Sequence, residues 1–278
     1  MTGVLYIVAT PIGNLDDFSA RAVATLKSVD LIAAEDTRHS KRLLQHFGIS
    51  TRMISYHEHN EASRIEKMLA QLRGGTEIAL ISDAGTPLIS DPGYGLVAAA
   101  HQAGIRLSPI PGSNSVIAAL SVAGLPTDSF YYQGFLSHRN SERVARLEAL
   151  KDIKATLVLL ESSHRIERLL QQLAQIFPQN LVVVAKELTK LHERLMRGTA
   201  AELIEIFQSD AALTKGEFVV LIDNPIEAQS RQLNGDEVDM MKILLTELPL
   251  KLAVKIATRL THKKKNDLYQ LALQLRQE

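Results

Sequence analysis

Four short apolar runs that alternate with helical patterns constrain the fold of the first part of the chain. The runs are VLYIVA, DLIAAE, EIALIS and IRLSPI, at residues 4–9, 30–35, 77–82 and 105–110. Runs of this length, bounded by polar residues, glycine or proline, are typical of strands buried on both faces of a parallel sheet. Helical patterns at 37–47, 61–73 and 94–103 each end at a glycine. Residues 1–112 are therefore predicted to form a doubly wound parallel α/β domain.

A second α/β pattern begins at residue 113 with a helix over 113–123. Further strands are predicted near 130–135, 155–160, 181–187, 193–197 and 217–222, with helices at 141–151, 163–176 and 199–208. This order predicts a second α/β domain with a mixed sheet over residues 113–225.

The C-terminal part, residues 226–278, is predicted to be a linker followed by a small helical domain. Helical apolar spacing recurs at 236–247, 250–260 and 264–276, which favours three short helices in a helix-turn-helix-like bundle. Basic residues gather in this part, at Lys251, Lys255, Arg259, Lys263, Lys264 and Lys265.

Composition narrows the function classes. The chain has no cysteine, which excludes disulfides, thiolate catalysis and cysteine-based zinc sites and suits a cytoplasmic location. The opening lacks the basic segment of a signal peptide, and no apolar run approaches the ~18 residues that span a bilayer, so a soluble protein is expected. Lysine plus arginine and aspartate plus glutamate both total 31, so any nucleic-acid contact must come from local basic patches.

The most informative loop is SDAGTPLISDPGYG, residues 82–95, which follows a predicted buried strand. Its glycines and prolines exclude a regular helix, and glycine lets backbone groups approach a ligand closely. In an open parallel sheet, ligands bind in the crevice beyond the carboxyl ends of the strands. A ligand loop is therefore predicted, the alternative being a tight connection in which Asp91 caps the next helix.

Two more loops follow predicted strands of the same sheet. ATPIGNLDD, at 9–17, lacks the glycine spacing of a dinucleotide fingerprint, and turn chemistry before a helix capped by Ser19 explains it about as well. PIPGSNS, at 109–115, places backbone N–H groups and hydroxyls at a helix N-terminus. Three such loops at strand ends of one sheet jointly predict one ligand site.

Other reaction classes find little support in the sequence. His57, Glu58 and His59 are adjacent, but neighbouring residues on an extended chain point to opposite faces and no matching third ligand is evident, so no metal is expected. The sequence contains neither a nucleophile elbow nor a Walker loop, which leaves hydrolase and NTPase functions unsupported.

Seven motifs in order carry a family resemblance: ATPIGNLDD, AEDTRHSKRLL, SYHEHNE, LISDAGTPLISDPG, PIPGSNS, LLESSHR and KELTKLHE. They resemble the bacterial small-subunit ribosomal RNA methyltransferase I group of the tetrapyrrole methylase superfamily. The resemblance covers roughly residues 1–225, and the tail is similar to that group's C-terminal helix-turn-helix domain. It implies a homodimer that binds S-adenosylmethionine in an interdomain cleft and methylates the 2′-oxygen of a cytidine in the decoding region of 16S rRNA, in the small ribosomal subunit.

The resemblance also implies a set of contacts to the methyl donor. These are Pro11, Ile12, Ser82, Asp83, Ala84, Gly85, Thr86, Leu88, Ile89, Ser115, Val116, Leu160, Glu161 and Glu217. Carboxylates among them are expected to hold the polar ends of the donor.

The proton acceptor and the RNA contacts are assigned from chemistry. A ribose hydroxyl needs a base, and Lys186 is favoured because burial lowers a lysine pKa, with Glu187, Glu35 and His57 as alternatives. Candidate phosphate contacts are Arg38, Lys41, Arg42, Arg139, Arg143, Lys263, Lys264 and Lys265.

Two other functions remain open at this point. A porphyrin-precursor C-methyltransferase would share the fold and the donor. Enzymes of that kind are similar to one another in having a glycine-rich first loop, whereas this chain has ATPIGNLDD at that place. A non-catalytic ribosome-binding module would bind the donor and transfer no methyl group.

Overall fold

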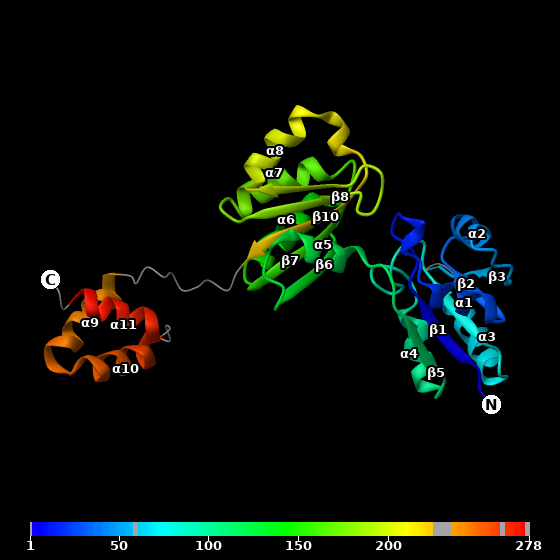
Figure 1. The fold of residues 1–278 in the computed structure, drawn as a ribbon, viewed down its shortest axis with the longest axis horizontal. Helices are drawn as coiled ribbons and strands as arrows, with labels where there is room; N and C mark the ends of the chain where they lie inside the picture. Colours follow the sequence, from blue (N-terminus) through cyan, green and yellow to red (C-terminus); the bar gives the residue numbers. More distant parts are fainter. Residues whose placement is uncertain (1, 58–60, 225–234, 262–264, 276–278) are drawn as a thin grey trace. The chain divides into compact units, whose positions relative to one another are not determined.

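The computed structural model describes residues 2–57, 61–224, 235–261 and 265–275. The chain forms two compact units (Figure 1). The first comprises Met1–Asp152 and Thr156–Asp223, and the second comprises Ile153–Ala155 and Asn224–Glu278. Both α/β sheets belong to the first unit, so the site can be built within it.

The first sheet is entirely parallel, with the strand order β3-β2-β4-β1-β5. Its strands are β1 (Val4–Val8), β2 (Leu31–Ala34), β3 (Met53–Ser55), β4 (Ile78–Ile81) and β5 (Arg106–Ile110). The four strands predicted from apolar runs are confirmed. The sequence did not reveal β3, because it has three half-buried residues at the edge of the sheet and leaves almost no apolar run.

Helices cover both faces of this sheet, which confirms the doubly wound prediction. They are α1 (Ala20–Ser28), α2 (Thr37–His46), α3 (Glu61–Arg73) and α4 (Tyr94–Gln102), with a 3₁₀ turn, η1 (Leu15–Asp17). Leu26 of α1 and Leu44 of α2 pack with Ile32 on one face. Met68 of α3 and Leu96 of α4 belong to the core on the other face.

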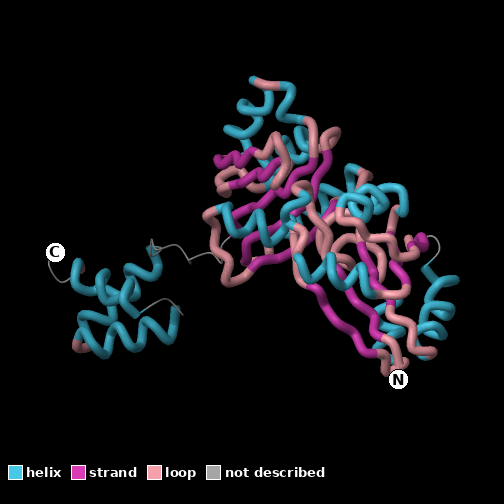
Figure 2. The backbone as a smooth tube through the Cα atoms, turned by 45° about the vertical axis from the view of Figure 1, so that its right-hand side comes forward, coloured by secondary structure: helices cyan, strands magenta, loops and turns pink. Residues whose placement is uncertain are grey.

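The second sheet has the strand order β6-β7-β10-β8-β9. Figure 2 draws the strands in magenta and the helices in cyan. Its strands are β6 (Phe130–Phe135), β7 (Ala155–Ser162), β8 (Val182–Lys186), β9 (Arg194–Gly198) and β10 (Glu217–Asn224). The sheet is mixed, since β6 and β7 are parallel whereas β8 is antiparallel to both β9 and β10.

Helices on the second sheet are α5 (Ser115–Ala123), α6 (Asn140–Leu150), α7 (Ile166–Ile176) and α8 (Ala200–Ser209), followed by η2 (Ala211–Thr214). Leu120 of α5 packs in one core with Ala185 and Val219 of the sheet. On β10 the preceding residue, Phe218, places its ring centroid 6.0 Å from that of Phe207 in α8. Because neighbouring strand residues face opposite sides, α5 and α8 cover opposite faces.

The C-terminal unit contains α9 (Gly235–Glu247), α10 (Leu250–Thr261) and α11 (Lys265–Gln274). Met241, Val254 and Leu268 place one buried residue from each helix in a shared core. Within the described ranges of the chain, the helices are all too short or too polar to cross a membrane.

Candidate donor cavity and its carboxylates

The three loops that follow β1, β4 and β5 meet at one edge of the first sheet, as predicted. Thr10 donates its backbone N–H to the Gly85 carbonyl at 2.8 Å, and Gly85 donates back to the Thr10 carbonyl at 3.1 Å. The Thr86 hydroxyl donates to the Ser113 carbonyl at 3.2 Å. These bonds join the loops because the carboxyl ends of parallel strands lie at the same edge.

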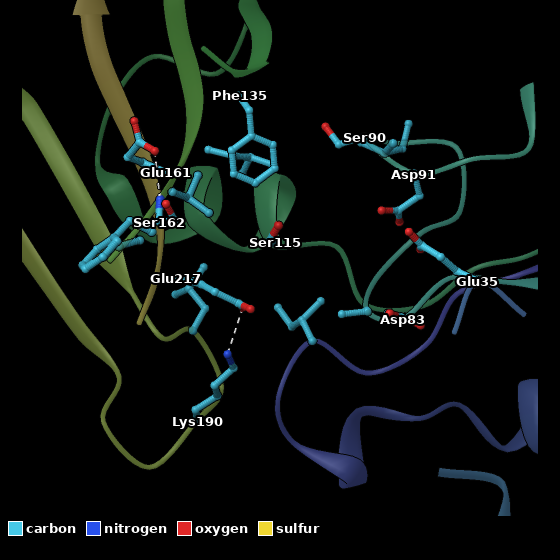
Figure 3. Close-up of a pocket in the computed structure, with 18 residues that line it drawn as sticks. Glu35, Asp83, Ser90, Asp91, Ser115, Phe135, Glu161, Ser162, Lys190 and Glu217 are labelled. Carbon is cyan, nitrogen blue, oxygen red and sulfur yellow. Dashed lines mark hydrogen bonds and ion pairs between the residues drawn. The ribbon is translucent and has the colours of Figure 1, made fainter. Parts of the chain in front are cut away.

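A cavity of about 390 Å³ lies where these loops face the second sheet (Figure 3). Its volume falls within the roughly 300–1,000 Å³ of typical small-molecule sites. Its lining residues are Ile12, Glu35, Asp83, Ala84, Ile89, Ser90, Asp91, Ser115, Phe135, Leu160, Glu161, Ser162, Ala185, Leu188, Lys190, Glu217, Phe218 and Val219. Both sheets therefore contribute walls to the same cavity.

The structure brings eight of the predicted donor contacts to this cavity: Ile12, Asp83, Ala84, Ile89, Ser115, Leu160, Glu161 and Glu217. Pro11 lines a neighbouring cavity of about 410 Å³. The remaining residues support the loops and the core: Ser82, Gly85 and Thr86 through hydrogen bonds, and Leu88 and Val116 through apolar packing.

Three carboxylates from the first sheet gather on one side of the cavity: Glu35, Asp83 and Asp91. The Asp83 carboxylate accepts the backbone N–H of Asp36 at 3.0 Å. Burial raises the pKa of Glu35, and the negative charges of Asp91 and Asp83 raise it further. Burial likewise raises the pKa of Asp91, against the effect of a hydrogen bond with Ser82.

The alternative role of Asp91 as a helix cap is wrong. Helix α4 is preceded by Gly93, at φ 131°, and receives no hydrogen bond from a capping side chain. The Asp91 carboxyl group instead points toward that of Glu35 (Figure 3). Sequence reasoning had identified the right loop, but a carboxylate just before a helix is most simply read as its cap.

The carboxylate of Glu161 is engaged by two arginines and does not point freely into the cavity. Its Oε2 lies 2.8 Å from Arg143 Nη2, and its Oε1 lies 3.0 Å from Arg165 Nε. Gln172 accepts a further hydrogen bond from Arg143 Nε at 2.7 Å. Glu161 lines the cavity with its carboxylate charge balanced by these arginines, and its contact with the donor stays a prediction.

Arg143 is not a phosphate contact, which corrects a second expectation. It is 2% exposed, and RNA cannot reach a guanidinium that is enclosed within the protein. The sequence placed it on a polar helix start, where an arginine is usually solvated. Its partner Glu161 lies on a different element, so no local pattern reveals the pair.

Lys186, the favoured proton acceptor, is not among the described residues that line the cavity. Ala185 lines the cavity, and Lys186 follows it directly on β8, so the two side chains face opposite sides of the sheet. Lys186 pairs in register with Phe218, which lines the cavity and also places its ring centroid 6.0 Å from that of Phe207 in α8. The geometry therefore favours the carboxylates of the first sheet over this lysine as a base.

Among the described residues that line the cavity, the lysine is Lys190, which the sequence did not single out. Its Nζ lies 3.1 Å from Glu187 Oε1 and 2.9 Å from Glu217 Oε2. Burial opposes ionisation of Glu187, but the hydrogen bond from the Glu217 N–H and the contact with Lys190 hold the Glu187 pKa below its ordinary value. Glu187 is therefore an anchor for Lys190 and a weak base.

The remaining predicted contacts lie on the surface or outside the described residues. Arg38 pairs with Asp36 at 3.0 Å and Arg139 with Glu142 at 2.9 Å, whereas Lys41 and Arg42 are exposed on α2. Lys263 and Lys264 lie outside the described residues, and Lys265 begins α11.

His57 lines an adjoining cavity, and Glu58 and His59 also lie outside the described residues. In the portion that is described, no cluster of three potential metal ligands occurs.

The fold and the cavity at its strand ends define a methyltransferase of the tetrapyrrole methylase class. The sequence model of the tetrapyrrole (corrin/porphyrin) methylases matches residues 4–204. A solved diphthine synthase superposes with a TM-score of 0.62 at 17% identity, covering 79% of this chain and 89% of that one. A solved uroporphyrin-III-C-methyltransferase from Thermus thermophilus superposes with a TM-score of 0.56 at 22% identity. This match covers 80% of this chain and 95% of that one. At these identities the likeness shows the fold alone.

Curated relatives narrow the class to one family. Ribosomal RNA small subunit methyltransferase I of Pseudomonas aeruginosa is 47% identical, with 98% of this chain and 97% of the relative covered. The protein of the same name from Escherichia coli O157:H7 is 46% identical, with 98% of this chain and 95% of the relative covered. The sequence model described as the RsmI C-terminal HTH domain matches residues 232–276. The chain belongs to the ribosomal RNA small subunit methyltransferase I family, whose members are S-adenosylmethionine-dependent.

Proposed function

We propose that this protein transfers a methyl group from S-adenosylmethionine to the ribose 2′-oxygen of a cytidine in the decoding region of 16S rRNA. The observation that carries the proposal is the cavity of about 390 Å³ at the meeting point of three backbone-rich loops, in a chain 47% identical to a ribosomal RNA methyltransferase. The substrate is the small ribosomal subunit, and the enzyme acts in the cytoplasm as a homodimer.

The chemistry of the cavity fits this donor. Leu160, Leu188 and Val219 form an apolar wall suited to an adenosyl group, and carboxylates on the opposite side suit a positively charged sulfur. The bound donor supplies a methyl group on a sulfonium sulfur: the sulfur–carbon bond breaks, its electron pair stays on sulfur, and an oxygen–carbon bond forms. Lys190 and Glu217 offer a cation and an anion for the charged amino-acid end of the donor.

The residues of the chain position the reactants and accept one proton. Glu35 lies at the cavity with a raised pKa, which makes it a stronger base than an ordinary glutamate. In this proposal its carboxylate takes the proton of the 2′-hydroxyl and then releases it to solvent. Asp91 sustains the raised pKa through its negative charge.

Filling the cavity should abolish donor binding. Ala84 lines the cavity and is itself exposed, so Ala84→Leu adds volume inside the site without disturbing the core. We expect titration calorimetry to detect binding of S-adenosylmethionine and of its demethylated product to the unmodified protein, and a loss of affinity of at least about tenfold in the variant. Ala24→Leu, at an exposed position of α1, is the matched control and should bind normally. Equal affinities in both variants would place the donor elsewhere.

The reaction itself is tested with labelled donor and small subunits from cells that lack the enzyme. We expect label in 16S rRNA at a single ribose, which then resists alkaline cleavage because its 2′-oxygen is blocked. Label in a tetrapyrrole precursor would instead support a porphyrin-precursor C-methyltransferase. Donor binding without any label transfer would support a non-catalytic ribosome-binding module.

Helix α10 carries a basic stripe, defined here as Lys251, Lys255 and Arg259. All three are exposed, and their spacing of four residues places them on one helix face. We propose that the stripe contacts RNA phosphates. Replacing all three with glutamine should weaken binding to small subunits and reduce the slope of log affinity against log salt by about 2 to 3.

The control for the stripe is Lys242→Gln, because this exposed lysine of α9 already pairs with Asp239 at 3.6 Å. Filter binding at several salt concentrations measures both variants. An unchanged slope in the triple variant would remove the stripe from the interface.

The proposed function divides the work between the domains. It assigns donor binding to residues 1–112 and 113–225 and RNA docking to residues 226–278.

A further inference from the structure

A second cavity, of about 470 Å³, adjoins the donor cavity. It is lined by Glu35, His57, Glu61, Ser90, Asp91, Pro92, Gly93 and Tyr94. Glu35, Ser90 and Asp91 line both cavities, so they form a shared wall. A group bound in the second cavity therefore lies directly across these three side chains from a ligand in the first.

We propose that the second cavity receives the acceptor nucleoside, with its base stacked on Tyr94 and an exocyclic amino group of the base bonded to Glu61. The inference rests on the proposed function and adds two residues that select the base. It requires the target nucleotide to leave any helical stack, as single-stranded RNA bases do when proteins read their edges.

Tyr94 is an unusually exposed aromatic residue for its position. Its side chain is 78% exposed although it begins a helix next to the cavity. Gly93 fixes this placement, because a Cβ there would lie 2.7 Å from Leu80 Cδ2 and its φ of 131° is strained for other residues. A solvated ring at a cavity mouth offers a face to a base, and such stacking changes affinity by about 5- to 100-fold per base.

Glu61 also lines this cavity, and two hydrogen bonds hold its carboxylate. Its Oε1 accepts the Tyr56 hydroxyl at 2.8 Å and the Gly95 backbone N–H at 3.0 Å. Tyr56 is fully buried, and a Cβ on residue 95 would lie 2.8 Å from that same oxygen. Two hydrogen-bond donors, the Tyr56 hydroxyl and the Gly95 N–H, thus orient the carboxylate before any ligand binds.

A fixed carboxylate discriminates between bases by hydrogen-bond polarity. An ionised glutamate only accepts hydrogen bonds. The N4 amino group of cytosine donates, whereas uracil presents the O4 oxygen at the same position, which a carboxylate repels. Glu61 therefore favours a base with an exocyclic amino group, and glutamine at this position would lose that preference because its amide can donate as well as accept.

The decisive experiment measures methylation of small subunits reconstituted with cytidine or uridine at the modified position. With the unmodified protein we expect kcat/KM for cytidine to exceed that for uridine by at least tenfold. Glu61→Gln should reduce this ratio by about 10- to 100-fold, partly by raising the rate on uridine. Calorimetry with S-adenosylmethionine should give an unchanged affinity, which also shows that the variant is folded.

Tyr94 supplies an independent arm of the test. Tyr94→Ala should raise KM for the subunits by about 5- to 100-fold with donor affinity unchanged, whereas Tyr94→Phe keeps the ring and should behave normally. A normal KM for Tyr94→Ala together with an unaltered base preference in Glu61→Gln overturns the inference. Loss of donor affinity in Glu61→Gln also overturns it, since the cavity would then belong to the donor. Failure of the unmodified protein to methylate any RNA would instead refute the proposed function.

Discussion

Glu35→Gln is expected to lower kcat for methyl transfer by about 10²- to 10⁴-fold, the usual contribution of a positioned general base. Glu35 lines the donor cavity and also the adjoining cavity, so a 2′-hydroxyl placed between them meets its carboxylate. Glutamine preserves the shape of the side chain and cannot accept the proton. Calorimetry with the donor should show near-normal affinity, which separates loss of chemistry from loss of binding.

The control for this replacement is Glu205→Gln, at an exposed position of α8 far along the chain. It should leave kcat within twofold of the unmodified value. Near-normal turnover in Glu35→Gln would show that another group takes the proton or that solvent receives it directly.

The pH dependence of the reaction follows from the same pair of carboxyl groups. Burial raises the pKa of Glu35 above its ordinary value, and the negative charges of Asp91 and Asp83 add to this effect. The ionised base is present above this raised pKa, so kcat should fall as the pH decreases through it. Asp91→Asn removes one negative neighbour, which favours the ionised form of Glu35. The acidic limb of the kcat profile should therefore move to lower pH in this variant, and a shift to higher pH would contradict the assignment.

Arg143→Met should destabilise the protein by about 3–5 kcal/mol, the usual cost of removing one partner of a buried ion pair. Arg143 and the Glu161 side chain are enclosed, at 2% and 0% exposure, and their charged atoms lie 2.8 Å apart. Methionine fills similar volume but leaves the Glu161 carboxylate with Arg165 alone. Urea denaturation of the variant and of the unmodified protein measures the difference.

Arg139→Met is the matched control, because Arg139 lies on the same helix start, is 81% exposed and pairs with Glu142. A surface pair of this kind contributes about 0–1 kcal/mol, so this variant should unfold almost normally. Similar unfolding curves for the two variants would show that the buried pair carries little stability. Strong weakening of RNA binding by Arg143→Met at full stability would restore its role as a phosphate contact.

The sequence by itself determined the four buried strands of the first sheet, its main helices and the loops that meet at the site. Apolar runs marked β1, β2, β4 and β5, and glycine and proline marked the loops after them. These signals are local, because strand burial and helix amphipathicity repeat over a few residues. Parallel strands then bring their carboxyl ends to one edge, so the convergence of the loops needed no knowledge of side-chain positions.

Only the tertiary structure decided which charged residues belong to the cavity. Arg143 looks like a solvated residue in the sequence, yet folding of α6 against β7 encloses it beside Glu161. Lys186 and Ala185 differ by one position, and the alternation of the strand sends only the alanine to the cavity. Asp91 reaches Glu35 across more than fifty residues of chain. Ionisable side chains act on whatever lies near them in space, and that neighbourhood exists only once distant segments have packed together.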